Sequence, residues 1–140
     1  MPEIKPLIEE NCRLSDFVRG SEEDFGYLYG CFDPVEIYEK HVSPLCKNFI
    51  YTRGAEPLHV FTPELHETFA VPQVKTVSTI GAGDNFNAGF VYGMLKEGIL
   101  KEQVKGLGLE DWGRLTAVAS KFSSSVCQSP FNYVDEDFEV

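Results

Sequence analysis

The residues from Thr79 to Asp84 read Thr-Ile-Gly-Ala-Gly-Asp and are the part of the sequence best suited to chemistry. Gly81 and Gly83 can adopt backbone angles closed to other residues, and without side chains they let a bulky anion approach the main chain. An apolar pattern of helical spacing begins at once, and the first turn of a helix leaves unpaired N–H groups and a partial positive charge. The stretch therefore predicts a phosphate site at a helix start. Asp84 is placed to accept a proton from a hydroxyl that attacks the phosphorus.

A purely structural role for the same residues stays open. Asp84 would then cap or favourably charge the helix N-terminus, and the glycines would form an ordinary tight turn. A bare Gly-x-Gly-Asp is short enough to favour that interpretation when it stands alone. No Gly-Lys-Ser/Thr follows the glycines and no third glycine completes Gly-x-Gly-x-x-Gly, so a Walker loop and a dinucleotide fingerprint are both excluded.

At these residues the chain resembles the ribokinase-like (PfkB) carbohydrate kinases, whose signature reads Asp-Thr-x-Gly-Ala-Gly-Asp before an apolar helix. Thr79 to Asp84 match it except at the first place, where Ser78 stands, and Asn85 to Phe90 continue as the family does. The resemblance implies phosphoryl transfer from ATP, with Mg²⁺, to a hydroxyl of a sugar or related small molecule. It assigns Asp84 as the base and the backbone of Gly81, Ala82 and Gly83 as the anion hole.

Further site residues follow only from this resemblance. The turn at Thr52 and Gly54 is similar to the family turn that borders the nucleotide, although Pro57 replaces its last glycine and can donate no N–H. Ser21 and Asp24 stand where the family has Asn-x-x-Glu, which organises phosphate and magnesium-bound water; an ordinary helix cap explains them equally well. No side chain is expected to bind the metal directly. The implied nucleotide-binding residues are Thr52, Gly54, Thr79, Ala117 and Ser120.

Two of these interpretations carry a reservation. The small residues Ala117, Ser120 and Ser123 would let a flat ring approach, but close packing against a neighbouring helix explains them as well. The family aspartate that helps to bind a monovalent cation is Ser78 here, and a hydroxyl brings no charge. Potassium activation is therefore in doubt.

Composition narrows the range of partners. A net charge of -10 argues against nucleic acid and anionic membranes, because both need clustered Lys and Arg. The four cysteines form no Cys-x-x-Cys pair, so thiols in a reducing cytoplasm are expected rather than disulfides or zinc ligands. The sequence shows no membrane-spanning run and no secretory signal, which also favours a cytoplasmic protein. Nothing in the sequence pairs His41, His59 or His66 with a nucleophile or a metal.

Alternating elements predict an α/β fold. The resemblance specifies a ribokinase-like three-layer α/β/α sandwich, of which only the C-terminal, nucleotide-binding part is present. On the helix that follows Asp84 we expect one broad apolar face, made of Phe86, Ala88, Phe90, Val91, Met94 and Leu95. The expected helices are Pro6–Asn11, one starting at Ser21, Pro34–Leu45, Asp84–Glu97 and Leu109–Cys127; the expected strands are Ser15–Arg19, Asn48–Thr52, Leu58–Thr62 and Glu67–Val71.

The resembling kinases are longer, and their sugar-binding residues and lid lie in an N-terminal half that has no counterpart here. We therefore expect residues 1–140 to form a single partial domain. An exposed sheet edge where further strands would pair predicts a homodimer or an association with such an N-terminal half. The alternative is a non-catalytic remnant that acts as a binding or interaction module.

Overall fold

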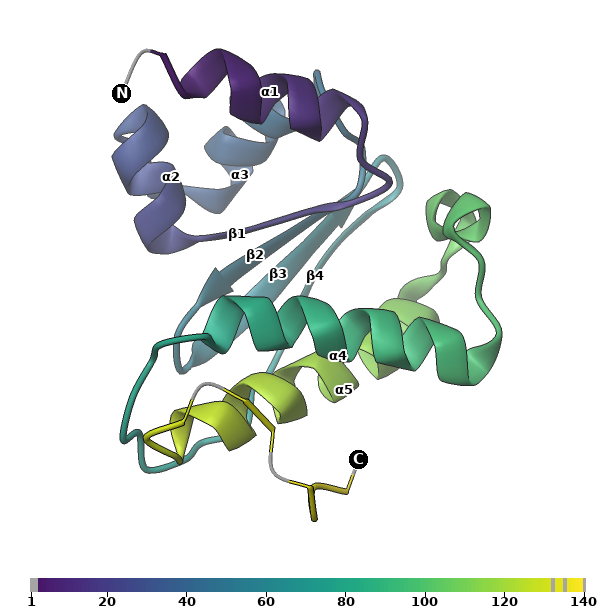
Figure 1. Ribbon diagram of the computed structural model, residues 1–140. Coiled ribbons are helices and arrows are strands. Elements are labelled where there is room, and N and C mark those ends of the chain that lie inside the picture. Colours follow the sequence, from purple (N-terminus) through teal and green to yellow (C-terminus); the bar gives the residue numbers. More distant parts are fainter. Residues whose placement is uncertain (1–2, 132, 135, 140) are drawn as a thin grey trace. The chain divides into compact units, whose positions relative to one another are not determined.

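The computed structural model describes residues 3–131, 133–134 and 136–139 (Figure 1). The chain divides into two units. Unit 1 comprises residues 1–68 and 101–107, and unit 2 comprises residues 69–100 and 108–140. Each described helix is too short or too polar to cross a bilayer.

A four-stranded sheet organises unit 1. Strands β1 (Val18–Ser21), β2 (Phe49–Arg53), β3 (Glu56–Thr62) and β4 (Leu65–Phe69) lie side by side in chain order. β1 and β2 are parallel, whereas β2 and β3 are antiparallel with an irregular register between Tyr51 and Arg53. Because β1 and β2 run in the same direction, Ser21 and Thr52 are neighbours at the carboxyl ends of their strands.

Helices cover one face of this sheet (Figure 1). They are α1 (Lys5–Arg13), α2 (Glu22–Tyr29), α3 (Pro34–Glu36) and the π-helix η1 (Ile37–Val42), while η2 (Lys101–Gly106) is a 3₁₀-helix of the same unit. The Asp33 side chain accepts the Val35 N–H at 3.0 Å, so Asp33-Pro34 starts α3 as its sequence predicts. A mostly aromatic cluster of buried side chains packs between these helices and the sheet. In it, Phe25 of α2 meets Phe49 edge-on, with ring centroids 5.2 Å apart. This cluster of buried side chains is Phe25, Ile37, Val42, Phe49, Tyr51 and Phe61.

Unit 2 is built on two helices packed against each other, α4 (Ala82–Glu97) and α5 (Leu109–Cys127). A Cβ placed on Gly89 of α4 would lie 2.9 Å from the Cα of Ala119 and 2.8 Å from the Phe122 ring. The two backbones therefore approach each other more closely than any side chain at position 89 allows. Gly98 ends α4 in the left-handed region, with φ 69°, as the sequence predicts.

The predicted elements are confirmed in kind and order, and α5 has the predicted bounds. Three predictions are wrong in detail. The strand predicted at Ser15–Arg19 lies at Val18–Ser21, the strand predicted at Glu67–Val71 starts and ends two residues earlier, and the helix predicted from Pro34 is α3 followed by a π-helix. Of the apolar residues expected on α4, Phe86, Phe90 and Met94 are buried, whereas Val91 and Leu95 are 47% and 75% exposed. The side of α4 that meets α5 carries Gly89 and Gly93 instead.

Candidate functional site

The glycine loop before α4 is held by its own backbone. Gly81 has φ 83° and ψ 0°, a left-handed conformation that strains any residue with a Cβ. Its carbonyl accepts both the backbone N–H and the side-chain amide of Asn85, each at 2.9 Å. The Ala82 N–H donates to the Thr79 carbonyl at 3.2 Å, so this predicted anion-hole amide is already bonded. Gly83 and Asp84 are the next amides of the first turn, where a helix supplies no acceptor.

Asp84 differs from two other aspartates that occupy the same place in a helix. Asp24 and Asp111 each stand three residues after an N-cap, and their carboxylates accept the N-cap N–H of Ser21 at 2.9 Å and of Gly108 at 3.0 Å. Both of those N-caps are extended, whereas Gly81 is left-handed. Among the described residues the Asp84 carboxylate has no hydrogen bond and no ion pair, and α4 has no side-chain cap. Its exposed carboxylate thus remains available to a ligand.

Ser21 and Asp24 form a complete capping box at the start of α2. The Ser21 hydroxyl accepts the Asp24 N–H at 3.1 Å, while the Asp24 Oδ2 accepts the Ser21 N–H. This is the ordinary cap that the sequence left open as one explanation. One carboxylate oxygen of Asp24, Oδ1, takes no part in the box.

Next to this cap, Thr52 and Gly54 lie at the end of β2 as predicted. Gly54 turns the chain into β3 with φ 58°. The Thr52 hydroxyl accepts a bond from the Arg19 guanidinium at 3.4 Å. Arg19 is a residue that the sequence analysis missed. The available signal was a basic side chain two residues before the Ser21 cap, in a chain with 12 basic and 22 acidic residues.

Ala117 and Ser120 of α5 do not share an environment. Ala117 is exposed, whereas Ser120 is 3% exposed and its hydroxyl has no partner among the described residues. The close helix approach that the small residues predicted is made by Ala119 against Gly89. Ala117 and Ser120 therefore differ in exposure, and their part in a ring-binding surface stays a prediction.

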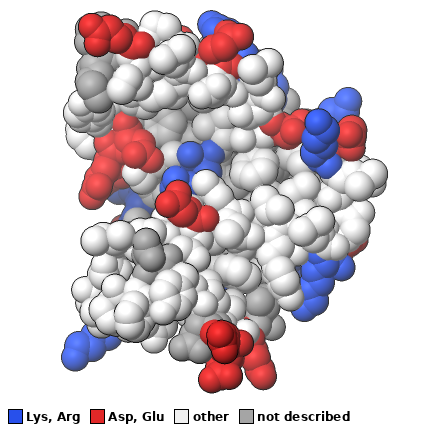
Figure 2. All heavy atoms as spheres, in the orientation of Figure 1, with Lys and Arg blue, Asp and Glu red and all other residues white. Residues whose placement is uncertain are grey.

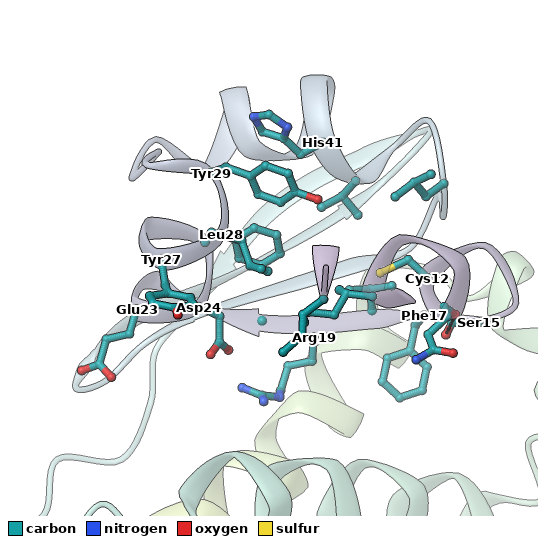
Figure 3. Close-up of a pocket in the computed structure, with 18 residues that line it drawn as sticks. Cys12, Ser15, Phe17, Arg19, Glu23, Asp24, Tyr27, Leu28, Tyr29 and His41 are labelled. Atoms are coloured by element: carbon teal, nitrogen blue, oxygen red, sulfur yellow. Dashed lines mark hydrogen bonds between the residues drawn. The ribbon is translucent and has the colours of Figure 1, made fainter. Parts of the chain in front are cut away.

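A pocket of about 720 Å³ lies within unit 1, between α1, α2 and β1. Its lining includes Arg19 and Asp24 but no residue of the loop from Gly81 to Asp84. Figure 3 shows the Arg19 guanidinium and the Asp24 carboxylate on the same side of β1, with the stacked rings of Tyr29 and His41 at the opposite end of the view. The pocket is a hollow beside the β1 edge of the sheet.

Charge is distributed unevenly on the face drawn in Figure 2, where carboxylates form several groups and Lys and Arg are scattered. Close to the capped helix starts, the charges are paired locally. The Glu22 carboxylate bonds the Arg53 guanidinium at 3.2 Å, and the Gly108 N–H, followed by Arg114, lowers the pKa of Asp111.

The predicted site residues fall into two groups. Unit 1 brings together Ser21, Asp24, Thr52 and Gly54 at the ends of two parallel strands, and unit 2 carries the loop from Thr79 to Asp84 together with Ala117 and Ser120. In unit 2 the loop is tied to the end of α5, because the N–H groups of Val77 and Ser78 donate to the Cys127 carbonyl at 2.6 and 3.2 Å.

Comparisons with known proteins identify the family. The model of the pfkB family of carbohydrate kinases matches residues 1–130. A fructokinase from Rhizobium leguminosarum bv. trifolii is 32% identical over 109 residues, which are 76% of this chain and 33% of that protein. A probable fructokinase-7 from Arabidopsis thaliana is 28% identical over 96 residues, 66% of this chain and 28% of that protein.

A solved structure shows the same fold. The fructokinase of Vibrio cholerae O395, in a form with fructose, ADP and calcium bound, matches 94% of this chain and 41% of its own with a TM-score of 0.79 and 21% sequence identity. The chain thus spans about a third of the length of the curated relatives it matches. The expected ribokinase-like α/β fold is confirmed, and the chain belongs to the PfkB family of carbohydrate kinases.

Proposed function

We propose that this chain carries the ATP-binding and phosphoryl-transfer part of a kinase that acts on a sugar or related small molecule, with Asp84 as the catalytic base. The observation that carries the proposal is the free carboxylate of Asp84 in a first helical turn. The two aspartates at the equivalent place of α2 and α5 are both bonded to their own N-caps. A left-handed Gly81 keeps Asp84 out of such a bond.

In this mechanism Asp84 accepts the proton of the sugar hydroxyl as its oxygen attacks the γ-phosphorus of ATP. The new O–P bond forms while the bond from phosphorus to the ADP oxygen breaks. The base needs hydrogen-bond reach more than a shifted pKa. The amides of Gly83 and Asp84 would donate to the phosphoryl oxygens, as unpaired N–H groups at a helix N-terminus do.

The residues at the end of β1 and β2 suit the phosphates and Mg²⁺. Arg19 would donate to a phosphate oxygen in exchange for its long bond to Thr52. Asp24 keeps one carboxylate oxygen outside its capping box, and that oxygen would accept from the water shell that Mg²⁺ usually retains. When bound, Mg²⁺ would neutralise charge on the phosphates. Gly54 and Thr52 would border the nucleotide, and Thr79 would support the loop.

The sugar and the partner form part of the same proposal. The two curated relatives are fructokinases, and fructose is a bound ligand in the Vibrio cholerae structure, so a sugar acceptor is favoured.

β1 pairs with β2 alone in the described sheet and lies next to the pocket. A strand from the N-terminal half of a PfkB kinase, or from a second copy of this chain, would pair there. A cytoplasmic location is proposed with it.

A second function is favoured by one observation, the completed capping box of Ser21 and Asp24. Both side chains satisfy α2, so they need no ligand to explain them. With Pro57 in the nucleotide turn, this geometry would also suit a non-catalytic member of the family that retains the fold as an interaction module.

Calorimetric titration of the 140-residue chain with Mg²⁺ and a non-hydrolysable ATP analogue tests the proposal. We expect saturable binding that Gly83→Val abolishes, because its side chain occupies the anion position, and that Asp84→Asn retains. Binding unaffected by Gly83→Val would place the phosphates elsewhere. A folded wild-type chain that binds no nucleotide would favour the interaction module.

A further inference from the structure

Two of the three histidines meet at the far edge of the unit 1 sheet. Nδ1 of His59 on β3 and Nε2 of His66 on β4 are 2.9 Å apart. Their ring centroids are 5.2 Å apart and their planes differ by 24°. Those values describe two nearly coplanar imidazoles joined end to end by one N–H···N hydrogen bond.

This geometry suits a proton rather than a metal ion. Two imidazole nitrogens that point straight at each other through a metal would be separated by about 4.1 Å, twice a typical Zn–N bond. The observed separation is far shorter. In addition, the described residues contain no group of three His, Cys, Asp or Glu side chains arranged around such an ion.

The surroundings of the pair are aromatic and carry positive charge. His66 stacks on Phe61 with centroids 4.0 Å apart, and Tyr51 of β2 meets His59 edge-on. From the covering helices, the Tyr38 ring stacks on Phe61, with centroids 4.8 Å apart. Burial, followed by the charges of His66 and Arg53, lowers the pKa of His59 from its ordinary value of 6.5. His59 therefore resists protonation.

The histidine pair lies near the point where the chain leaves unit 1. β4 crosses the boundary between the two units, which falls between Thr68 and Phe69. At its end Phe69 belongs to unit 2, where its ring lies 3.2 Å from the position of a Cβ on Gly113 of α5. At its start His66 is tied to β3 of unit 1. β4 is thus the strand through which the chain passes from the sheet toward the Asp84 loop.

We propose that His59 and His66 form a single-proton latch that fastens β4 to β3, and that protonation of both rings releases β4 from the sheet. The inference concerns unit 1 alone and does not rest on the proposed kinase activity. The latch is closed when the pair holds one N–H between the rings. Two imidazolium rings at this separation would repel each other and leave no acceptor for the bond.

The direction with pH follows from the lowered pKa of His59. Above pH 6.5 His59 is neutral in both the folded and the released form, and the latch contributes its full stability. As pH falls below 6.5 the released form takes up protons first, so the stability of the β3–β4 pairing decreases until the folded form also titrates.

Nuclear magnetic resonance of the full chain with ¹⁵N-labelled histidine tests the latch directly. We expect a scalar coupling across the N–H···N bond between His59 and His66 at about pH 7.5, and its loss at about pH 5.5. In parallel, hydrogen-exchange protection of the β4 amides, corrected for intrinsic exchange, should fall about tenfold or more relative to β2 over the same interval. The absence of any coupling at the higher pH would overturn the proposal.

The variant His66→Gln distinguishes the effect of the histidine pair from a loss of stability in acid that other groups cause. A glutamine amide can still bond His59 but cannot be protonated, so the β4 amides should lose most of their pH dependence. His41→Gln is the matched control, because His41 stacks on Tyr29 away from β3 and β4 and its removal should leave the coupling intact. Equal loss of β4 protection in the wild type and His66→Gln would contradict the latch. The wild-type coupling decides the question even if His66→Gln fails to fold.

Discussion

Asp84 shows how one residue type in one helical position takes different roles. At the start of α2 and α5 the aspartate three residues after the N-cap stabilises the helix through the N-cap N–H. At the start of α4 the left-handed Gly81 withholds that N–H. All three helices have Asp three residues after the N-cap, and the carboxylate is bonded where the N-cap is extended and unbonded where it is left-handed.

We expect Asp84→Asn to lower turnover about 10²–10⁴-fold while nucleotide affinity stays within about twofold, because an amide cannot take the hydroxyl proton. The assay is a coupled ADP release measurement on the Rhizobium leguminosarum fructokinase whose matching third is replaced by this chain. Asp111→Asn in the same hybrid is the control, since Asp111 caps α5. Near-normal turnover of the Asp84 variant would refute the assignment of the base.

The second prediction at the residue scale concerns Arg19. Replacing it with methionine should weaken binding of the Mg²⁺–ATP analogue about tenfold, which is the size of one charged hydrogen bond, and should leave adenosine binding unchanged. Calorimetry measures both. Arg13→Met is the matched control, because Arg13 forms an exposed ion pair with Glu10. Equal losses for ATP and adenosine would show that Arg19 supports the fold and not a phosphate.

The site was predictable from the sequence where backbone constraints determine it. Gly81 and Asp84 belong to a pattern that specifies a left-handed turn before a helix, and the structure has that turn. Arg19 was not recognised because its contact with Thr52 depends on the register that places β1 beside β2. The different environments of Ala117 and Ser120 could not be derived from their spacing, since exposure around a helix depends on what packs against it.

At the scale of elements, the contact between α4 and α5 depends on Gly89. A methyl group there meets the backbone of Ala119, which cannot rotate away. We expect Gly89→Ala to reduce the free energy of unfolding by about 1–3 kcal/mol despite the better helix propensity of alanine. Urea denaturation measures the change. Gly106→Ala serves as the control, because no atom lies within 4 Å of its added Cβ; a similar small effect of both substitutions would disprove the tight contact.

Elements with clear end signals were predicted best. α5 has the predicted bounds, and α4 ends at Gly98. The short strands shifted by two or three residues because pairing partners, and not local composition, fix where a strand begins. The π-helix after Pro34 was not foreseen, since helical spacing alone does not distinguish one extra residue in a turn.

At the scale of the whole molecule, the chain spans about a third of the length of its relatives. We propose that a partner strand pairs at the β1 edge, next to the pocket. Ile8 lines that pocket and Leu7, beside it, does not. We expect Ile8→Glu to weaken association about tenfold or more, because a buried carboxylate would oppose docking, and Leu7→Glu to have little effect.

Analytical ultracentrifugation of the chain alone, and of the chain mixed with the N-terminal part of the Rhizobium leguminosarum enzyme, measures this association. Either a homodimer or a mixed complex that responds to Ile8→Glu would support docking beside β1. A complex equally sensitive to both substitutions would place the interface elsewhere, and a monomer in both samples would refute it.

At Gly81, greater helix stability would conflict with keeping the Asp84 carboxylate free. A stability-guided redesign would replace Gly81 with serine or aspartate, which are the preferred N-cap residues, and would let the chain relax to the extended N-cap seen at Ser21. The same change would give Asp84 the N–H that Asp24 and Asp111 already hold. Selection for heat resistance at this position would therefore enrich variants that are better folded and chemically silent.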